Sequence, residues 1–334
     1  MRLPKTAPTW NDLNRDELIN SVTLNQIPGI EELIQRSNHN YLHWDKFRYQ
    51  SIPDGFSHKA LWLALERIRK AQQQCLPLEL ADDTKLWYWT PPLHQMWLHR
   101  IDQDAGGYVG SRSRLVPQDS DDRFLFNSLM EEAIASSQLE GATTTRPVAK
   151  MLLRTKRKPK DRHERMILNN YTAILNIRDM RNEQLTPEML CAIQEIITYK
   201  TLDREDAAGR FKDSRDGNVC VVDAHTGEML FEPPGHHHTE RLIDDLCDFA
   251  NGNDETFIHP AVKAIALHFM LGYIHPFADG NGRTARAVFY WYMLKKGYWI
   301  FEYLPISRIV LDAPVQYARA YRYGRDPFTW RWLY

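Results

Sequence analysis

The residue types required for phosphate chemistry are concentrated in one short stretch of the chain, His275 to Arg286. An imidazole has an unperturbed pKa of about 6.5, so His275 can accept a proton from an attacking hydroxyl group near neutral pH. Asp279 offers a hard carboxylate oxygen, and Mg²⁺ typically binds one or two carboxylates together with phosphate oxygens. The stretch therefore contains a candidate base and a candidate metal ligand.

A glycine-containing turn lies between these groups and a pair of arginines. Gly280 and Gly282 can adopt positive φ angles, which lets the backbone N–H groups around Asn281 turn inward as an anion-binding nest. Arg283 and Arg286 are three residues apart, so both guanidinium groups should project from nearly one face of a helix. These features predict a site for a nucleotide triphosphate.

Two predicted helices position this stretch. Apolar residues occupy nearly every face from Val262 to Ile274, which indicates a buried helix with His275 at its end. A second helix is predicted to begin at the nest and to end near Lys295, Lys296 and the capping Gly297. Phosphates bind readily at a positive helix N-terminus. The alternative is an ordinary turn beside a core histidine, but the joint occurrence of base, acid, nest and arginines argues against it.

The stretch closely resembles the Fic family signature, in which H-P-F, any residue, D or E, G-N-G-R, two residues and R surround the active site. Every fixed position is matched. The resemblance implies a mainly α fold, a Fic-type helical bundle with a small β-hairpin flap, whose enzymes usually transfer AMP from ATP to a protein hydroxyl. It implies that His275 is the general base and that Asp279 binds Mg²⁺. The residues implied to bind the nucleotide are Phe277, Gly280, Asn281, Gly282, Arg283 (β-phosphate region), Thr284 and Arg286 (γ-phosphate).

A second segment, Ser136 to Gly141, resembles the family's inhibitory pattern of S or T, three residues, E, then G or N. Apolar residues at helical spacing predict a helix over residues 123–135 just before it. The resemblance implies that Glu140 pairs with Arg286 where the γ-phosphate should settle, so that a carboxylate and a phosphate compete for one guanidinium. The alternative is a solvated glutamate near a helix end.

Residues 217–235 depart from the helical pattern. A short β-branched run, residues 219–222, is followed by turn composition at 223–228 and by the apolar residues 229–231, which predicts a hairpin. It resembles the Fic flap, whose exposed edge docks the target backbone as an added strand, and the resemblance extends the nucleotide site to Val221. A plain surface hairpin is the alternative.

Composition limits the other function classes. The net charge is −1 over 334 residues, so no overall attraction to nucleic acid or an acidic membrane is expected. The basic run Arg154 to Arg165 contains no aromatic residue, which favours a solvated linker over a contact with nucleic acid or an acidic partner. Four scattered cysteines and the absence of a signal or spanning segment predict a cytoplasmic protein without a membrane partner.

Three regions are expected along the chain. Residues 1–118 are predicted to form an all-helical accessory region, with helices near 29–36, 59–74 and 93–102. Residues 119–300 would hold the inhibitory helix and the catalytic core. Residues 301–334 would form a helical tail in which Tyr317 resembles the family's tyrosine beside the adenine, although Ala318 replaces a second tyrosine often present. Many relatives continue into a further small domain.

These observations favour a protein adenylyltransferase that uses ATP and modifies a serine, threonine or tyrosine of a target protein or of itself. A lysine stands at the position of Gly282 in the related Doc-type phosphotransferases, which argues against kinase chemistry. Removal of AMP with Glu140 activating water, transfer of UMP or phosphocholine, and a nucleotide-binding regulator acting by contact remain as alternatives. A homo-oligomer is compatible with the sequence.

Overall fold

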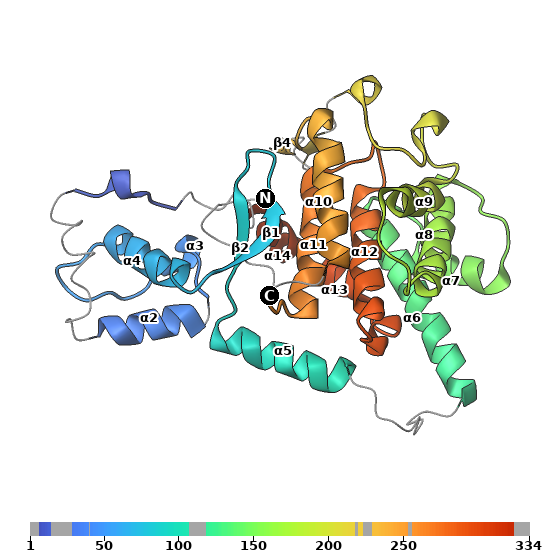
Figure 1. The fold of residues 1–334 in the computed structure, drawn as a ribbon. Helices are drawn as coiled ribbons and strands as arrows, with labels where there is room; N and C mark the ends of the chain where they lie inside the picture. Colours follow the sequence, from blue (N-terminus) through green and yellow to red (C-terminus); the bar gives the residue numbers. More distant parts are fainter. Residues whose placement is uncertain are drawn as a thin grey trace. The chain divides into compact units, whose positions relative to one another are not determined.

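The computed structural model describes residues 7–14, 29–39, 41–106, 118–217, 220–222, 229–252 and 256–323. Over these residues the chain is mainly helical and contains two small two-stranded sheets (Figure 1). The predicted mainly α fold class is confirmed. The chain divides into two compact units, the first made of residues 1–77, 84–99 and 315–334, the second of residues 78–83 and 100–314.

The N-terminal elements include each of the three helices predicted there. They are the short 3₁₀ helix η1 (Trp10–Asp12), helices α2 (Ile30–His39), α3 (Trp44–Phe47) and α4 (His58–Lys70), strands β1 (Gln74–Glu79) and β2 (Lys85–Tyr88), and helix α5 (Pro92–Ala105). The sheet of β1 and β2 corrects the prediction of an all-helical region. In β1, the buried Leu76 and Leu78 alternate with the exposed Pro77. This alternation is too short to predict a strand from the sequence.

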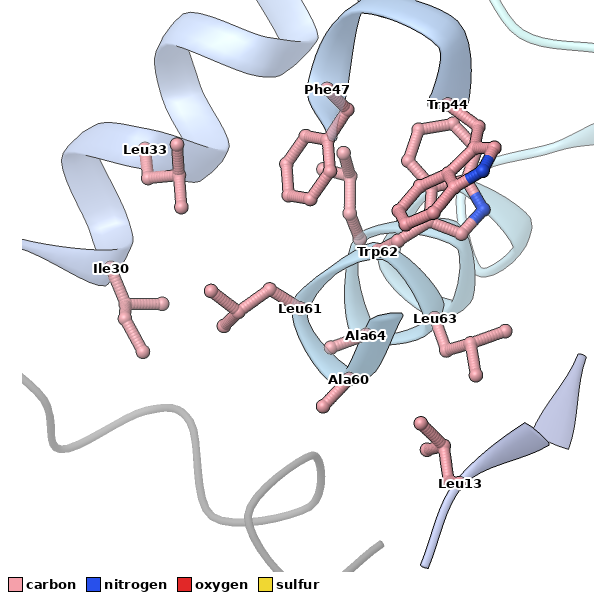
Figure 2. Packing of buried hydrophobic residues seen from close by; sticks show 11 residues of the cluster. Leu13, Ile30, Leu33, Trp44, Phe47, Ala60, Leu61, Trp62, Leu63 and Ala64 are labelled. Atoms are coloured by element: carbon pink, nitrogen blue, oxygen red, sulfur yellow. The ribbon is translucent and has the colours of Figure 1, made fainter. Parts of the chain in front are cut away.

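A tryptophan-centred core holds the first unit together (Figure 2). Trp62 is completely buried, and the rings of Trp44 and Phe47 pack against it with centroid distances of 5.9 and 5.5 Å. The guanidinium of Arg69 is also buried, and it donates hydrogen bonds to Asn38 Oδ1 and to two backbone carbonyls at 2.9–3.1 Å. Its burial is tolerated because these acceptors replace water. Trp44, Trp62 and Trp87 are therefore core residues, whereas Trp10 and Trp97 are exposed.

The second unit is a helical bundle. Its helices are α6 (Gln118–Leu139), α7 (Arg146–Thr155), α8 (Arg162–Asp179), α9 (Pro187–Thr198), α10 (Thr239–Asn251), α11 (Pro260–Ile274), α12 (Asn281–Lys295) and α13 (Ile306–Asp312), followed at the boundary by α14 (Pro314–Tyr323). Short 3₁₀ helices lie at η3 (Glu205–Ala207), η4 (Ser214–Asp216), η5 (His236–His238) and η6 (Trp299–Glu302). Strands β3 (Val221–Val222) and β4 (Met229–Phe231) complete it.

Helices α11 and α12 lie side by side at the centre of this bundle (Figure 1). Both are buried on nearly every face, as the apolar pattern of α11 predicts. Helix α12 also packs against α6, α8 and α9, so three further helices are in contact with the element that begins at the predicted anion nest. No helix among the described residues is both long and apolar enough to cross a membrane.

A buried carboxylate joins three of these helices. Glu132 on α6 is 4% exposed, and its Oε2 accepts hydrogen bonds from the Tyr290 hydroxyl of α12 and from the Ser307 backbone N–H of α13, both at 2.8 Å. The Ser307 hydroxyl donates to Oε1. Burial raises the pKa of Glu132, although the donors from Ser307 and Tyr290 oppose this effect. Glu132 therefore fixes the position of α6, the helix that ends at Leu139, just before Glu140.

Replacement of Glu132 by Ala should lower the free energy of unfolding by about 2–4 kcal/mol, because the backbone N–H and the hydroxyl of Ser307 would be buried without an acceptor. Urea denaturation measures this change. The matched control is Glu131→Ala, which removes the neighbouring carboxylate and its ion pairs with Arg146 and Lys150. We expect a loss of about 1 kcal/mol or less there. Equal losses for the two variants would contradict the role given to Glu132.

Candidate active site

His275 lies at the end of α11, where the sequence predicts it. Its backbone adopts the left-handed conformation with φ of 49° and ψ of 56°, and its N–H donates to Leu271 O at 3.0 Å. A non-glycine residue in this region is uncommon, although histidine is among the residues enriched there. The conformation ends the helix and turns the chain into the stretch from Pro276 to Gly280.

The side chain of Asn281 closes this stretch into a fixed loop. Its Oδ1 accepts a hydrogen bond from Phe277 N at 2.9 Å, and its Nδ2 donates to Phe277 O at 2.8 Å. These two bonds fix the orientation of the amide. Its Nδ2 also lies 3.1 Å from His275 Nδ1. Because Nδ2 can only donate, Nδ1 is the acceptor, and the neutral ring holds its hydrogen on Nε2 in this arrangement.

The His275 ring is neutral at physiological pH. Burial lowers its pKa to about 4, the positive charge of Lys212 acts in the same direction, and Glu140 and Asp279 oppose both effects. Lys212 also has a structural role. Its backbone N–H donates to Pro276 O at 2.7 Å, and its ammonium donates to Ile274 O at 3.4 Å and to Pro234 O at 3.3 Å. Sequence analysis missed this residue, because no motif there identifies a lysine distant in the chain from His275.

The predicted nest lies at the N-terminus of α12. Gly280 has a φ of 86° and precedes Asn281, the first residue of the helix. Gly282 lies within the helix and does not have the positive φ that the sequence suggested for it. The first N–H groups of a helix have no partner within it and point outward, which suits an anion. A Cβ atom on Gly280 would lie 2.9 Å from Thr198 Cγ2, so the turn also requires glycine for space.

The two arginines of α12 have different partners in this structure. Arg283 is 1% exposed, and it donates to Ile197 O at 3.1 Å and to Asp279 Oδ1 at 3.2 Å. Arg286 instead contacts the end of α6. The two guanidinium groups were predicted to share one face of the helix as a phosphate clamp. The contacts show that both are held by protein oxygens here, which a phosphate would have to replace or supplement.

The segment Ser136 to Gly141 lies against Arg286, as the resemblance implies. Arg286 Nε donates to Ser136 Oγ at 2.9 Å, and Nη2 donates to Ser136 O at 3.0 Å and to Glu140 Oε1 at 2.8 Å. Burial alone would raise the pKa of Glu140, but the positive charges of Arg286 and Arg283 outweigh burial and hold it below its ordinary value. Gly141 follows with a φ of 87°. Glu140 is thus an ionised partner of Arg286.

Gly282 lets Glu140 approach this closely. A Cβ atom on Gly282 would lie 2.2 Å from Glu140 Oε1, which is much shorter than a van der Waals contact, so the two atoms would overlap. The Glu140 side chain is 28% exposed and reaches over the N-terminal turn of α12. The carboxylate therefore occupies space beside the backbone groups predicted to bind phosphate.

Asp279 has one engaged and one more open carboxylate oxygen. Oδ1 accepts from Gly280 N at 2.5 Å and from Arg283, whereas the nearest cationic group to Oδ2 is Arg162 Nη2 at 3.9 Å. The side chain is 38% exposed. No group of three metal-binding side chains occurs among the residues that the structure describes. Asp279 therefore fits Mg²⁺ as a single protein ligand whose remaining oxygens come from phosphates and water, the usual pattern for this ion.

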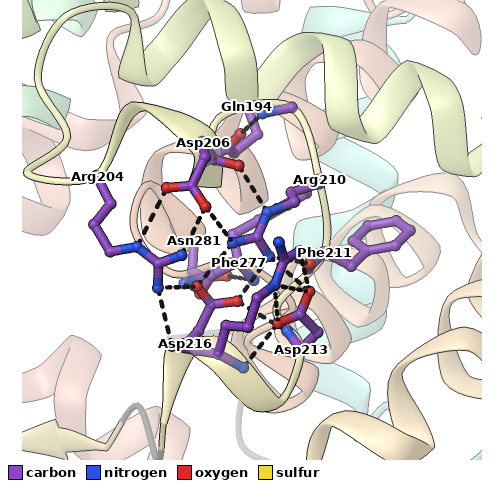
Figure 3. Close-up of polar contacts among 11 residues, drawn as sticks. Gln194, Arg204, Asp206, Arg210, Phe211, Asp213, Asp216, Phe277 and Asn281 are labelled. Carbon is purple, nitrogen blue, oxygen red and sulfur yellow. Dashed lines mark hydrogen bonds and ion pairs between the residues drawn. The ribbon is translucent and has the colours of Figure 1, made fainter.

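The loop before the hairpin packs against the stretch from Pro276 to Gly280 (Figure 3). Arg210 makes a two-pronged contact with Asp216 at 2.8 and 3.0 Å, which folds residues 204–217 onto themselves. Gln194 of α9 accepts from Gly209 N at 2.7 Å and donates to Asp279 O at 3.1 Å. The ring of Phe211 packs on Phe277 with a centroid distance of 5.3 Å. In the sequence, the closely spaced Arg and Asp residues between positions 204 and 216 are the pattern that could have predicted this network of ion pairs.

The predicted hairpin is confirmed in its backbone. Strands β3 and β4 pair antiparallel, with Val221 opposite Phe231, Val222 opposite Met229, and an irregularity in between. The predicted turn at 223–228 lies outside the described residues, as do residues 218–219 and the side chain of Val221.

Two predicted nucleotide-binding residues have completely buried side chains. Phe277 and Thr284 therefore support the loop and the helix from inside. Tyr317 lies in helix α14.

Comparison with known proteins agrees with this geometry. Residues 184–293 match the Fic/DOC family model, and helix α6 and Glu140 lie before the matched region. The chain is 30% identical over 82 residues to protein adenylyltransferase fic-1 of Caenorhabditis elegans and 36% identical over 66 residues to protein adenylyltransferase Fic of Nematostella vectensis. These matches cover 25% and 20% of this chain and 16% of each relative.

Solved structures show the same fold. A Fic family protein from Desulfovibrio desulfuricans aligns with a TM-score of 0.57 at 23% identity, covering 71% of this chain and 69% of that one. Fic-1 from Caenorhabditis elegans aligns with a TM-score of 0.52 at 15% identity, covering 87% of this chain and 83% of that one. At these identities the likeness concerns the fold, and the chemistry must be argued from the site.

Proposed function

We propose that the protein is an adenylyltransferase that transfers AMP from ATP to a serine, threonine or tyrosine hydroxyl of a protein. The observation that carries this proposal is the placement of a neutral His275, fixed by Asn281, at the loop that leads into the N-terminus of α12. A base and an anion site are thereby adjacent. The relatives named protein adenylyltransferase support the same reaction, although each match covers a small part of the relative.

In the proposed reaction the acceptor hydroxyl gives its proton to the His275 ring, and its oxygen forms a bond to the α-phosphorus. The bond between the α-phosphorus and its bridging oxygen to the β-phosphate breaks, and pyrophosphate leaves. The lone pair of His275 Nδ1 accepts the hydrogen bond from Asn281. The ring therefore takes up the proton either at Nδ1, in place of that hydrogen bond, or at Nε2, after the ring hydrogen has moved from Nε2 to Nδ1. A bound polyphosphate adds negative charge near the ring and so raises the pKa of His275 above its value of about 4. The pKa then lies closer to the operating pH, where a general base is most effective.

Residues of α12 and its preceding turn would hold the donor. The N–H groups that follow Gly280 would bind phosphate oxygens, and Arg286 would bind the terminal phosphate once it is released from Glu140. Asp279 would hold Mg²⁺, which neutralises phosphate charge when it is bound. The hairpin of β3 and β4 would hold the target backbone as an added strand, which leaves sequence preference loose. The same cradle fits UMP or phosphocholine donors.

The contact of Glu140 with Arg286 would restrain this reaction. With Oε1 at 2.8 Å from Nη2, the carboxylate takes a donor that the terminal phosphate needs. A nucleotide bound beside it would have its α-phosphate displaced from the line of attack. Ser136 would hold Arg286 near its present position after the Glu140 carboxylate has moved away. Its Oγ and its backbone O both accept hydrogen bonds from the Arg286 guanidinium.

Incubation of the full chain with ATP and magnesium tests the proposal. We expect intact-mass spectrometry to show the added mass of one AMP on the chain itself or on a protein from a cell lysate. An α-labelled ATP should transfer its label and a γ-labelled ATP should not, because pyrophosphate leaves. Transfer of the γ-label would show kinase chemistry. Absence of any transfer by the Glu140→Gly variant would reject the proposal.

Removal of AMP from a modified protein is the second candidate. The ionised Glu140 carboxylate is partly exposed and electrostatically coupled to His275, so it can accept a proton from water. Release of AMP from a labelled target that depends on Glu140 would favour this reaction over transfer.

A further inference from the structure

A basic hollow opens beside the candidate active site. It has a volume of about 300 Å³, and its cationic lining residues are Lys160, Arg162, Arg165 and Lys200. Two carboxylates, Asp161 and Asp203, also line it. Lys160, Arg162 and Lys200 are exposed, so their charges are available to a partner in solution. The hollow includes part of the basic run for which sequence analysis favoured a solvated linker.

The backbone around the hollow is fixed. Glu164 on α8 is 4% exposed in its side chain, and it accepts two hydrogen bonds from Arg157 at 2.6 Å and one from Lys160 N at 2.8 Å. The Arg157 contact lowers the pKa of Glu164 to about 2, so the anchor stays ionised. Asp161 caps α8 by accepting from Glu164 N at 2.8 Å. The loop 156–161 is therefore a rigid platform, which lowers the entropy cost of binding to it.

The hollow adjoins the residues proposed to bind phosphate. Arg162 lies in its wall, with Nη1 3.2 Å from Asp203 Oδ1 and Nη2 3.9 Å from Asp279 Oδ2. The segment 197–203 supplies the opposite wall. The same segment supports the nest, because Ile197 O accepts from Arg283 and Thr198 packs against Gly280. An anion in the hollow would thus lie next to Asp279.

We infer that this basic hollow binds acidic side chains of the protein substrate that flank its acceptor hydroxyl. The inference rests on the proposed transfer of AMP to a protein. Four cationic groups against two carboxylates leave a net positive lining that complements a short acidic segment. None of the lining residues is aromatic, and the neighbouring exposed ring of Tyr199 already has the cationic groups of Arg165 and Lys200 over it, at 5.9 and 5.2 Å from its centroid.

The test is a binding titration of the full chain without nucleotide. Two fluorescent peptides share an acceptor serine, followed by four glutamates in one and four glutamines in the other. We expect the glutamate peptide to bind more tightly and to lose this advantage at high salt. Lys200→Glu should weaken its binding roughly three- to tenfold and leave the glutamine peptide unchanged. Lys158→Glu is the matched control, because Lys158 carries the same charge nearby but does not line the hollow.

Each other outcome overturns the inference. Equal binding of the two peptides, or equal losses for Lys158→Glu and Lys200→Glu, would show that the hollow has no specific role. A lower affinity of Lys200→Glu for ATP without a change for the peptide would assign the hollow to the nucleotide. Tighter binding of a single-stranded oligonucleotide that Lys200→Glu abolishes would assign it to nucleic acid. Because the titration requires no AMP transfer, its result is independent of whether the proposed reaction occurs.

Discussion

Replacement of His275 by Ala should reduce the rate of AMP transfer by about 10²- to 10⁴-fold, the usual contribution of a positioned base. The variant keeps the N-terminus of α12 and Arg286, so its affinity for ATP should be nearly unchanged. Transfer of α-labelled ATP under single-turnover conditions measures the rate, and equilibrium titration with ATP measures the affinity. A rate equal to that of the parent chain would exclude His275 as the base.

The matched control for this variant is His236→Ala, which removes an exposed histidine of η5. We expect no change in either measurement. The pH profile of the parent provides a second check. A base must be deprotonated to act, so the rate should fall as pH decreases through the pKa of His275, which is about 4 in the free protein and higher once the polyphosphate is bound. A protonation step above pH 8 in the free protein would contradict the buried position of the ring.

Sequence patterns were sufficient for the centre of the fold, whereas one long-range contact was available only from the resemblance to a known family. The apolar run 262–274 and the glycine turn at 280–282 located α11 and α12, because burial on all faces and a positive-φ turn leave strong local signals. The contact between Glu140 and Arg286 joins residues 146 positions apart. No local pattern predicts such a contact, and it was available only through resemblance to a family motif.

The supporting residues were beyond sequence reasoning for a physical reason. Glu132, Gln194 and Lys212 act through partners on other helices or loops, and each looks like an ordinary polar residue within its own segment. Their burial follows from packing of the whole bundle. The partners of Arg283 were missed in the same way, since helical spacing fixes the face from which a side chain projects but not the oxygen it reaches.

Replacement of Glu140 by Gly should raise AMP transfer by roughly 10- to 100-fold. The charge-assisted hydrogen bond between Glu140 and Arg286 must be broken before a phosphate can bind that guanidinium, and such bonds contribute about 1.5–3 kcal/mol. Labelling of the chain itself or of a lysate protein with α-labelled ATP measures the increase. Glu140→Gln should give an intermediate increase, because an amide retains a hydrogen bond without the charge.

The control for Glu140→Gly is Gln138→Gly, which places glycine in the last turn of α6, two residues before Glu140, where the Gln138 side chain donates to Thr144 O rather than contacting Arg286. We expect no activation from it, so that local loosening of the helix is separated from loss of the carboxylate. The double variant Glu140→Gly, His275→Ala should be as slow as His275→Ala alone, because freeing Arg286 helps the donor to bind but supplies no base. A Glu140→Gly variant that transfers AMP no faster than the parent chain would show that the carboxylate does not restrain transfer, and a variant that binds ATP but transfers nothing would reject the transfer reaction and favour a use of Glu140 in the removal of AMP.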